Sequence, residues 1–164
     1  MKRIYFFVLL LISLAGFSQS DNSLVKFLNP TSAPPSKGYS HAAEIDLGNC
    51  KMVIISGQIA LDSNGNLVGK GNLAEQTEQI FTNIRNIVLE SGGTMNDVIR
   101  IGIYMTDITQ VQTMRDVRDK FLNQRKPPTS TLVEVSKFHR DDLLIEIEAT
   151  AIIPVKSKKK TTNR

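Results

Sequence analysis

The sequence predicts an α+β fold in which two helices pack on one face of a mixed β-sheet. Several stretches alternate apolar and polar residues, as half-buried strands do, whereas two others repeat apolar residues at the helical spacing. Strands and helices follow one another in the order β-β-α-β-α-β-β. The 164 residues are enough for one ordinary domain, and a hydrophobic content of 41% is typical of a folded protein.

The first two strands are expected near Ala42–Asp46 and Met52–Ala60, with a turn around Gly48-Asn49. Ser56-Gly57 lies inside the second strand, and a glycine at such a position often marks a bulge or a close approach by other atoms. The preceding segment, Asn29–Ser40, is rich in proline, serine and glycine, which predicts an extended chain.

The first helix is expected to begin after Asn72, a good N-cap residue, and Glu75 stands three positions later, where a capping-box partner belongs. Gly92-Gly93 provides the stop signal. One face of this helix is interpreted as core packing, and it consists of Leu73, Thr77, Ile80, Phe81, Ile84, Ile87 and Val88.

The second half of the chain predicts a strand, a helix and two further strands. They span Asp97–Asp107, about Thr109 to Leu122, Thr129–Phe138 and Leu143–Pro154. The last strand carries Glu146 and Glu148, which lie two residues apart and therefore point to the same face. Alternation alone favours a wet sheet face for both carboxylates.

The two ends of the chain differ from the predicted domain, which spans residues 42–154. Residues 1–18 combine a basic start, the apolar run "IYFFVLLLISLAG" and small residues, which predicts a cleavable signal peptide and a secreted or periplasmic protein. An uncleaved N-terminal anchor is the alternative. Residues 19–41 are expected to form an extended N-terminal segment. Residues 155–164 are expected to be a disordered basic tail, solvated rather than bound to nucleic acid.

Composition argues against several classes of function. The single cysteine, Cys50, cannot form an intrachain disulfide, and His41 and His139 lack the spacing of metal ligands. Without its tail the domain is close to neutral, aromatic residues make up only 6% of the chain, and no glycine-rich phosphate loop occurs. We therefore expect no metal, no cofactor, no nucleic-acid partner and, after signal cleavage, no membrane association.

Six stretches of the chain match a known family in order and spacing. They are "GYSHA" from Gly38, "SGQIALD" from Ser56, "AEQTEQIFTNI" from Ala74, "YMTD" from Tyr104, "LVEV" from Leu132 and "IEIEATA" from Ile145. On these motifs the chain resembles the RidA/YjgF family over nearly all of Asn29 to Pro154. Each motif alone is weak, but together they are specific.

The resemblance implies a chorismate-mutase-like α+β fold and a homotrimer. Small carboxylate or imine ligands would bind in clefts at the subunit interfaces. Active members of the family hydrolyse reactive enamines and imines to 2-oxo acids and ammonia, without a metal or an organic cofactor.

The resemblance also implies roles for individual residues. Glu146 is similar to the family glutamate that orients or activates water, and Tyr39 is similar to the cleft tyrosine, so these two are the candidate catalytic residues. Ser56 and Gly57 resemble ligand-binding donors of the cleft. His41 is interpreted as a local hydrogen-bonding residue rather than a base.

The chain departs from the family pattern just before the "VEV" strand. Deaminating members carry an arginine there that clamps the substrate carboxylate, whereas this chain has Ser130, followed by Thr131. Both hydroxyl residues remain candidate ligand-binding residues, but a hydroxyl cannot replace a fixed, permanently charged guanidinium. We hypothesise that Arg115, on the second helix, enters the same cleft as a relocated cation. The alternative is a solvent-exposed Arg115 paired with Asp119 one turn later.

Three functions stay open at this point. The first is an imine or enamine deaminase with an altered substrate. The second is an exported trimer that binds a small carboxylate or aromatic molecule without turnover. The third, an endoribonuclease, is the weakest because the domain is near neutral and poor in aromatic residues.

Overall fold

The computed structural model describes residues 24–155. The expected signal peptide, the beginning of the 19–41 segment and almost all of the basic tail lie outside the described residues. Within residues 24–155, no helix combines the length and the apolar character that are needed to cross a bilayer.

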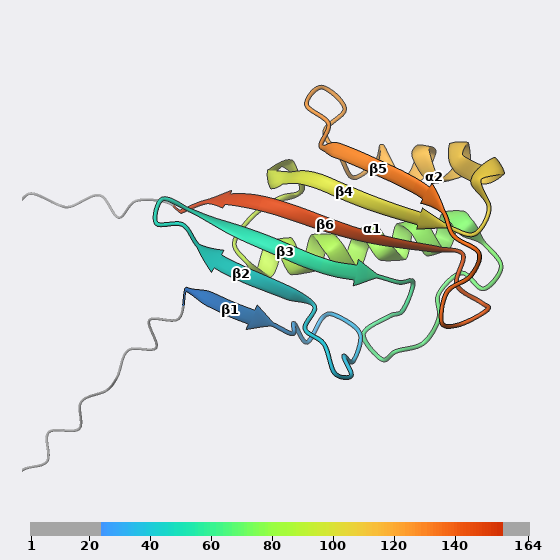
Figure 1. Cartoon of the computed structure of the whole chain (residues 1–164), viewed down its shortest axis with the longest axis horizontal. Coiled ribbons are helices and arrows are strands. Elements are labelled where there is room, and N and C mark those ends of the chain that lie inside the picture. The colour runs from blue at the N-terminus through green and yellow to red at the C-terminus, as the bar shows by residue number, and fades with distance from the viewer. Residues whose placement is uncertain (1–23, 156–164) are drawn as a thin grey trace, which may run out of the picture.

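A six-stranded mixed sheet forms the centre of the molecule (Figure 1). Its strands are β1 Val25–Leu28, β2 Ala42–Asp46, β3 Cys50–Gln58, β4 Val98–Met105, β5 Thr129–Glu134 and β6 Ile145–Pro154. They lie in the order β1-β2-β3-β6-β4-β5, and every neighbouring pair is antiparallel except β4 and β5, which are parallel. Two helices accompany the sheet, so the predicted α+β architecture is confirmed.

Strand β1 is an element that the sequence analysis missed. Val25–Leu28 pairs with β2 in antiparallel register, inside the segment for which only an extended chain was expected. Four residues are too few to establish a period of two, so the pattern "VKFL" carried no strand signal of its own. The strand adds an edge to the sheet and leaves Phe27 69% exposed.

The first helix, α1 (Leu73–Glu90), begins as predicted at Asn72. The Asn72 side-chain oxygen accepts the Glu75 backbone N–H at 3.2 Å, and the Asn72 amide donates to the Glu75 carboxylate at 2.8 Å. One of the N–H groups at the start of the helix is thereby satisfied. The buried face of α1 contains the whole predicted stripe.

The second helix, α2 (Val111–Arg118), is shorter than predicted at both ends. Before it, the Asp107 carboxylate accepts the Thr109 N–H and caps a short 3-10 turn at Ile108–Gln110. After it, the N–H groups of Lys120 and Phe121 bond three residues back, which tightens the last turn. Strand β5 is also shorter than predicted because its partner β4 ends at Met105.

Strict alternation along β6 divides the sheet into a core face and an open face. Ile145, Ile147, Ala149, Ala151 and Ile153 are buried under the helices, where Phe81 of α1 stacks on Phe121. The intervening side chains, from Glu146 to Ile152, are half-buried on the face that α1 and α2 do not cover (Figure 1).

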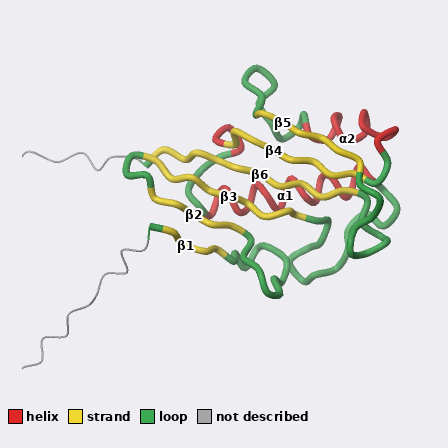
Figure 2. The backbone as a smooth tube through the Cα atoms, in the orientation of Figure 1, coloured by secondary structure: helices red, strands yellow, loops and turns green. Residues whose placement is uncertain are grey.

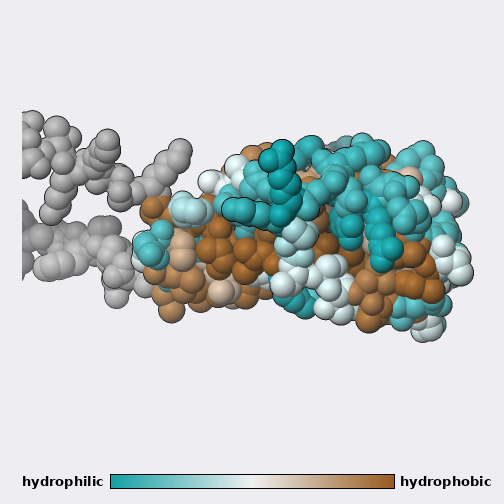
Figure 3. Space-filling model, turned by 90° about the horizontal axis from the view of Figure 1, so that it is seen from above, coloured by the Kyte–Doolittle hydropathy of each residue, from teal (hydrophilic) through white to brown (hydrophobic). Residues whose placement is uncertain are grey.

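The open face carries several exposed apolar side chains. Ile54 and Val133 are 45% and 41% exposed, and strand pairing places both on this face together with Phe27. Seen from above the view of Figure 1, apolar residues gather along one side of the molecule and hydrophilic residues along the other (Figure 3). Such a face on a folded domain often marks an interaction surface.

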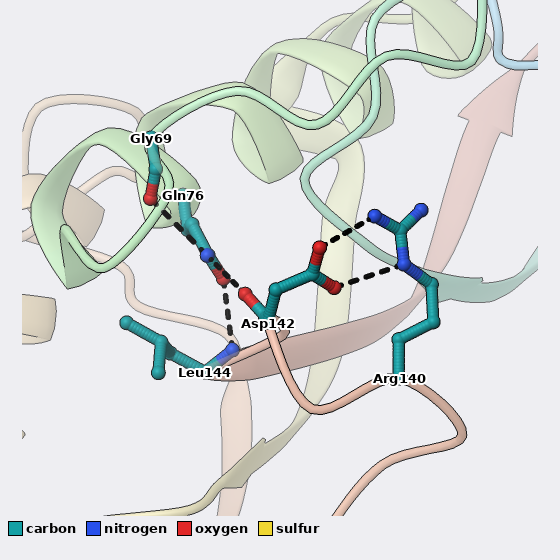
Figure 4. Close-up of polar contacts among 5 residues, drawn as sticks. All are labelled: Gly69, Gln76, Arg140, Asp142 and Leu144. Carbon is teal, nitrogen blue, oxygen red and sulfur yellow. Dashed lines mark hydrogen bonds and ion pairs between the residues drawn. The ribbon is translucent and has the colours of Figure 1, made fainter.

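A buried glutamine fixes the loop that leads into β6. Gln76 of α1 is fully buried, and its side-chain amide donates to the carbonyls of Gly69 and Asp142 at 3.2 and 2.8 Å. Its side-chain oxygen accepts the N–H of Leu144 at 2.9 Å (Figure 4). All three bonds of this amide hold the start of β6 against the start of α1.

We predict that Gln76→Ala lowers the free energy of unfolding by about 2 kcal/mol, because it leaves the partly buried Asp142 carbonyl and Leu144 N–H without their partner. Urea unfolding followed by circular dichroism measures this loss. Glu78→Ala, an exposed position two residues later on the same helix, is the control and should change stability by less than about 0.5 kcal/mol. Equal effects of the two substitutions would contradict the role assigned to Gln76.

Candidate functional site

Four of the predicted site residues meet in one hollow. Tyr39, Ser56, Gly57 and Glu146 line a cavity of about 720 Å³, which we call the glutamate hollow. It lies where β3 ends and β6 begins, and loops gather at this end of the sheet (Figure 2). The remaining lining residues are Pro35, Lys37, Ile59, Leu61, Asn64, Gly65, His139 and Arg140.

Glu146 occupies its place because Gly57 has no side chain. The antiparallel register of β3 and β6 shifts between Ile55 and Gln58, which is the bulge that a glycine inside a strand suggested. A Cβ atom at Gly57 would overlap the carboxylate of Glu146. The glutamate side chain therefore packs directly against the backbone of β3.

The hollow raises the pKa values of its two candidate catalytic groups. Burial raises the pKa of the Glu146 carboxyl, Glu148 adds to this effect, and the charge of His139 opposes it. Burial and the charge of Glu146 raise the pKa of Tyr39, so its phenol keeps its proton near neutral pH. A carboxylate with a raised pKa is a better base, and a protonated phenol is a hydrogen-bond donor.

Ser56 and His41 hold the segment that carries Tyr39. The Ser56 hydroxyl donates to the Ser40 carbonyl at 2.7 Å, and the Ser56 N–H donates to the His41 carbonyl at 2.9 Å. The proton of the Ser56 hydroxyl is thus committed to this bond, so towards a ligand in the hollow the hydroxyl can act only as an acceptor.

His41 is buried and serves as a local hydrogen-bonding residue, which confirms its interpretation. Its Nε2 lies 2.7 Å from the Pro34 carbonyl, and its Nδ1 lies 3.4 Å from the Gln58 amide. The ring also contacts Tyr39 edge-on, with centroids 5.4 Å apart. The hydrogen bonds hold the His41 ring in place, and this ring supports one side of the Tyr39 ring.

Three basic residues of the glutamate hollow were not among the predicted site residues: Lys37, His139 and Arg140. Arg140 is held by a two-point pair with the Asp142 carboxylate, with Nε and Nη2 at 2.9 and 2.7 Å (Figure 4). The signal that could have found two of them is the run "FHRDD", which directly precedes the strand of Glu146.

Glu148 lies outside the hollow and belongs to the open sheet face. Its carboxylate accepts from Arg100 at 2.8 Å, and it lies over Gly102, where a Cβ atom would come within 2.6 Å of it. The two neighbouring glutamates of β6 therefore have different environments: Glu146 has a hollow beside it, and Glu148 has a cation.

Ser130 and Thr131 lie apart from the glutamate hollow. Parallel pairing sets Ser130 opposite Ile101, on the helix side of the sheet, where it lines a second cavity of about 370 Å³. We call this cavity the serine hollow. Thr131 pairs with Gly102 and so points to the open face. Within one chain, a small ligand in contact with Glu146 cannot also contact Ser130.

Helix α2 presents a different arginine to the serine hollow from the one the sequence suggested. Arg115 is exposed and lines neither hollow, whereas Arg118 lines the serine hollow. Asp119 pairs with Arg118 at 2.8 Å rather than with Arg115. Helical spacing could have identified Arg118, because it lies four residues after the buried Met114 and hence on the same side.

Among the described residues, no three His, Cys, Asp or Glu side chains come together as a metal site.

Comparison with known families agrees with this fold. The sequence model of the family described as Endoribonuclease L-PSP matches residues 30–153. The chain belongs to this family, also called RidA/YjgF. The match covers strands β2 to β5, all of β6 but its last residue, and both α-helices, so the resemblance seen in the six motifs is confirmed.

Relatives in this family agree with the assignment. The chain is 35% identical to a RutC family protein of Pyrococcus abyssi over 69% of this chain and 84% of that protein. It is 30% identical to a protein of Dermatophagoides farinae named 2-iminobutanoate/2-iminopropanoate deaminase, over 76% and 92% of the two chains. The crystal structure of E. coli TdcF with bound serine superposes with a TM-score of 0.67 at 28% identity, covering 77% and 98% of the two chains.

The raised pKa of Glu146 predicts a stability effect that depends on pH. The folded chain holds the Glu146 proton more tightly than the unfolded chain, so this stabilisation is complete below the unfolded pKa of about 4.3 and is lost as pH rises through the folded pKa. Glu146→Gln should therefore unfold at a higher urea concentration than the unsubstituted protein near pH 7. The difference should close towards about pH 4.

Glu148→Gln is the matched control, on the same strand and face. It removes the partner of Arg100 and should leave stability unchanged or slightly lower at neutral pH. Urea midpoints are compared at equal protein concentration. A Glu146→Gln protein less stable than the unsubstituted one at pH 7 would show that the carboxylate is stabilised, not strained, in the hollow.

Proposed function

We propose that this chain is an imine deaminase of the RidA/YjgF family that hydrolyses a small imine carrying a carboxylate to a carbonyl compound and ammonia. The observation that carries this proposal is Glu146: a half-buried carboxylate with a raised pKa that lies against Gly57 and shares a hollow with the phenol of Tyr39. Such a group is suited to accept a proton from water near neutral pH.

The hydrolysis follows from these two groups and one water molecule. Glu146 accepts a proton from water as the water oxygen bonds to the imine carbon, and the C=N double bond becomes a single bond. Glu146 returns this proton to the nitrogen, which gives a carbinolamine. The C–N bond then breaks as the hydroxyl group loses its proton and forms the C=O bond, and that second proton passes to the nitrogen, which leaves as ammonia. Tyr39 donates a hydrogen bond that orients the substrate. The overall hydrolysis needs no oxidant and no cofactor.

The names of relatives support the reaction and the size of the ligand. The Dermatophagoides farinae protein is named as a deaminase of 2-iminobutanoate and 2-iminopropanoate, and the E. coli TdcF structure holds serine. A hollow of about 720 Å³ has room for an amino-acid-sized molecule.

A homotrimer is part of the proposal. Glu146 and Ser130 face opposite sides of one sheet, so a ligand that meets both needs two copies of the chain. The exposed apolar residues of the open face, Phe27, Ile54 and Val133, favour burial of this face against neighbouring copies.

Export is the second part of the proposal and rests on the signal-peptide pattern of residues 1–18. A secreted or periplasmic deaminase meets few of the imines that arise in the cytoplasm. Together with serine at position 130, this favours a substrate other than 2-aminoacrylate, the enamine on which active members of the family act.

A second candidate function is an exported trimer that binds a small carboxylate without turnover. Ser130 favours it, since a hydroxyl lacks the charge that fixes a carboxylate for reaction. Measured turnover separates the two functions.

Ammonia release from imines generated in situ from several amino acids tests the proposal. We expect turnover by the unsubstituted protein and a loss of at least about 100-fold in Glu146→Gln, because the water loses its base. Glu148→Gln should keep its rate. Binding of 2-oxo acids without ammonia release from any imine would favour the binding protein instead.

The open face predicts a second result. Ile54→Asp places a charge on this face and should convert trimers to monomers, as measured by light scattering after gel filtration. Leu89→Asp is the control, because Leu89 is 54% exposed on α1, on the opposite side of the sheet. Trimers that survive Ile54→Asp would place the subunit interface elsewhere.

A further inference from the structure

The serine hollow has the size and the lining of a ligand site. Its volume of about 370 Å³ falls within the range of small-molecule sites. Helix α2, the 123–128 loop and β5 surround it, and its walls combine one cation and its paired carboxylate with apolar and amide groups. The lining residues are Ile101, Arg118, Asp119, Leu122, Asn123, Gln124, Pro127, Pro128 and Ser130.

We propose that the serine hollow is a carboxylate-binding site in which Arg118 supplies the cation. Its ligand is a small organic acid with one carboxylate and a short apolar chain, such as a 2-oxo or 2-imino acid. The binding site itself needs only one chain, whereas its part in turnover rests on the proposed function.

The geometry of Arg118 leaves one edge of its guanidinium group for a ligand. Both Nε and Nη2 contact the same Asp119 oxygen, Oδ1, at 2.8 Å. A guanidinium group has five N–H donors, and this side-on contact uses two of them. Nη1 makes no hydrogen bond or ion pair with another described residue, so the Nη1/Nη2 edge can receive a carboxylate in the two-point geometry that arginine favours.

The amides of the hollow are already engaged, which keeps its wall rigid. The side-chain oxygen of Asn123 accepts the N–H groups of Arg125 and Lys126 at 3.0 and 3.2 Å. The Gln124 amide donates to the Asp119 carbonyl at 3.0 Å. These bonds shape the loop around the cavity and leave Arg118 and the Ser130 hydroxyl to meet a ligand.

The remaining lining favours a monocarboxylate over phosphate. Ile101 and Leu122 are buried, and with Pro127 and Pro128 they offer an apolar wall to a short carbon chain. Asp119 partly neutralises the one arginine, and its charge repels a doubly charged anion. A phosphate site would call for more donors and more positive charge than this hollow contains.

The relation of Arg118 to Arg115 follows from helix geometry. Residues four apart lie on one side of a helix, so Arg118 shares the side of Met114, which is completely buried in the core. Arg115 directly follows Met114 in the sequence, so it points to a different side of the helix, and it is exposed. The two arginines of one short helix therefore provide a test residue and a control of the same chemistry.

Calorimetric titration of the full chain with 2-oxobutanoate, a stable 2-oxo acid, tests the proposal. We expect Arg118→Ala to weaken binding about 10- to 100-fold, since it removes charge-assisted hydrogen bonds. Arg115→Ala should bind like the unsubstituted protein, and inorganic phosphate should bind far more weakly than the oxo acid. Circular dichroism verifies that each variant is folded.

Asp119→Asn is a second test, which keeps the cation and is expected to increase the affinity for the ligand. Without its competing carboxylate, Arg118 should bind 2-oxobutanoate more tightly. Four results would each overturn the proposal. Two concern the variants: unchanged binding in Arg118→Ala, or an equal loss of affinity in Arg115→Ala. Two concern the unsubstituted protein: tighter binding of phosphate than of the oxo acid, or no binding of the oxo acid. Glu146→Gln separates the two proposals, because it should retain 2-oxobutanoate binding at the serine hollow while turnover disappears.

Discussion

The contact between the Glu146 carboxylate and the backbone of Gly57 is the constraint on which the candidate site depends. A side chain at position 57 would occupy the place of the carboxylate, so the bulge of β3 and the glutamate of β6 form one structural unit. The contact also removes water from part of the carboxylate and so raises its pKa. The same atoms thus determine both the position and the basicity of the group that would activate water.

The hollow around this contact is built from loops, and buried polar residues keep those loops in place. Gln76 ties the start of β6 to α1, and His41 bonds to the Pro34 carbonyl and contacts the Tyr39 ring. Both side chains are buried and hydrogen-bonded, so losing either one would leave unpaired polar atoms in the interior. Polar groups at these two positions provide rigidity that apolar packing alone would not give to short loops.

Periodicity along the chain could predict the strands, the first helix and the shared face of Glu146 and Glu148, because these depend on local sequence. It could not show that Glu148 meets Arg100, which is 48 residues distant, or that β1 joins the sheet through only four residues. The face of Ser130 depends on the register between two parallel strands, which no local pattern reveals. The approach of His139 and Arg140 to Glu146 follows from the path of a loop, so only the fold could place them.

The separation of base and cation has an electrostatic consequence. A guanidinium group beside Glu146 would stabilise the carboxylate and lower its pKa, which would make it a weaker base. In this chain Arg118 lies on the helix side of the sheet and already pairs with Asp119, whereas Arg140, at the glutamate hollow, is occupied by Asp142. Each nearby guanidinium therefore has its own carboxylate, and the burial of Glu146 remains the dominant influence on its pKa. A cation that bound substrate in direct contact with Glu146 would oppose the proton transfer that the hollow favours.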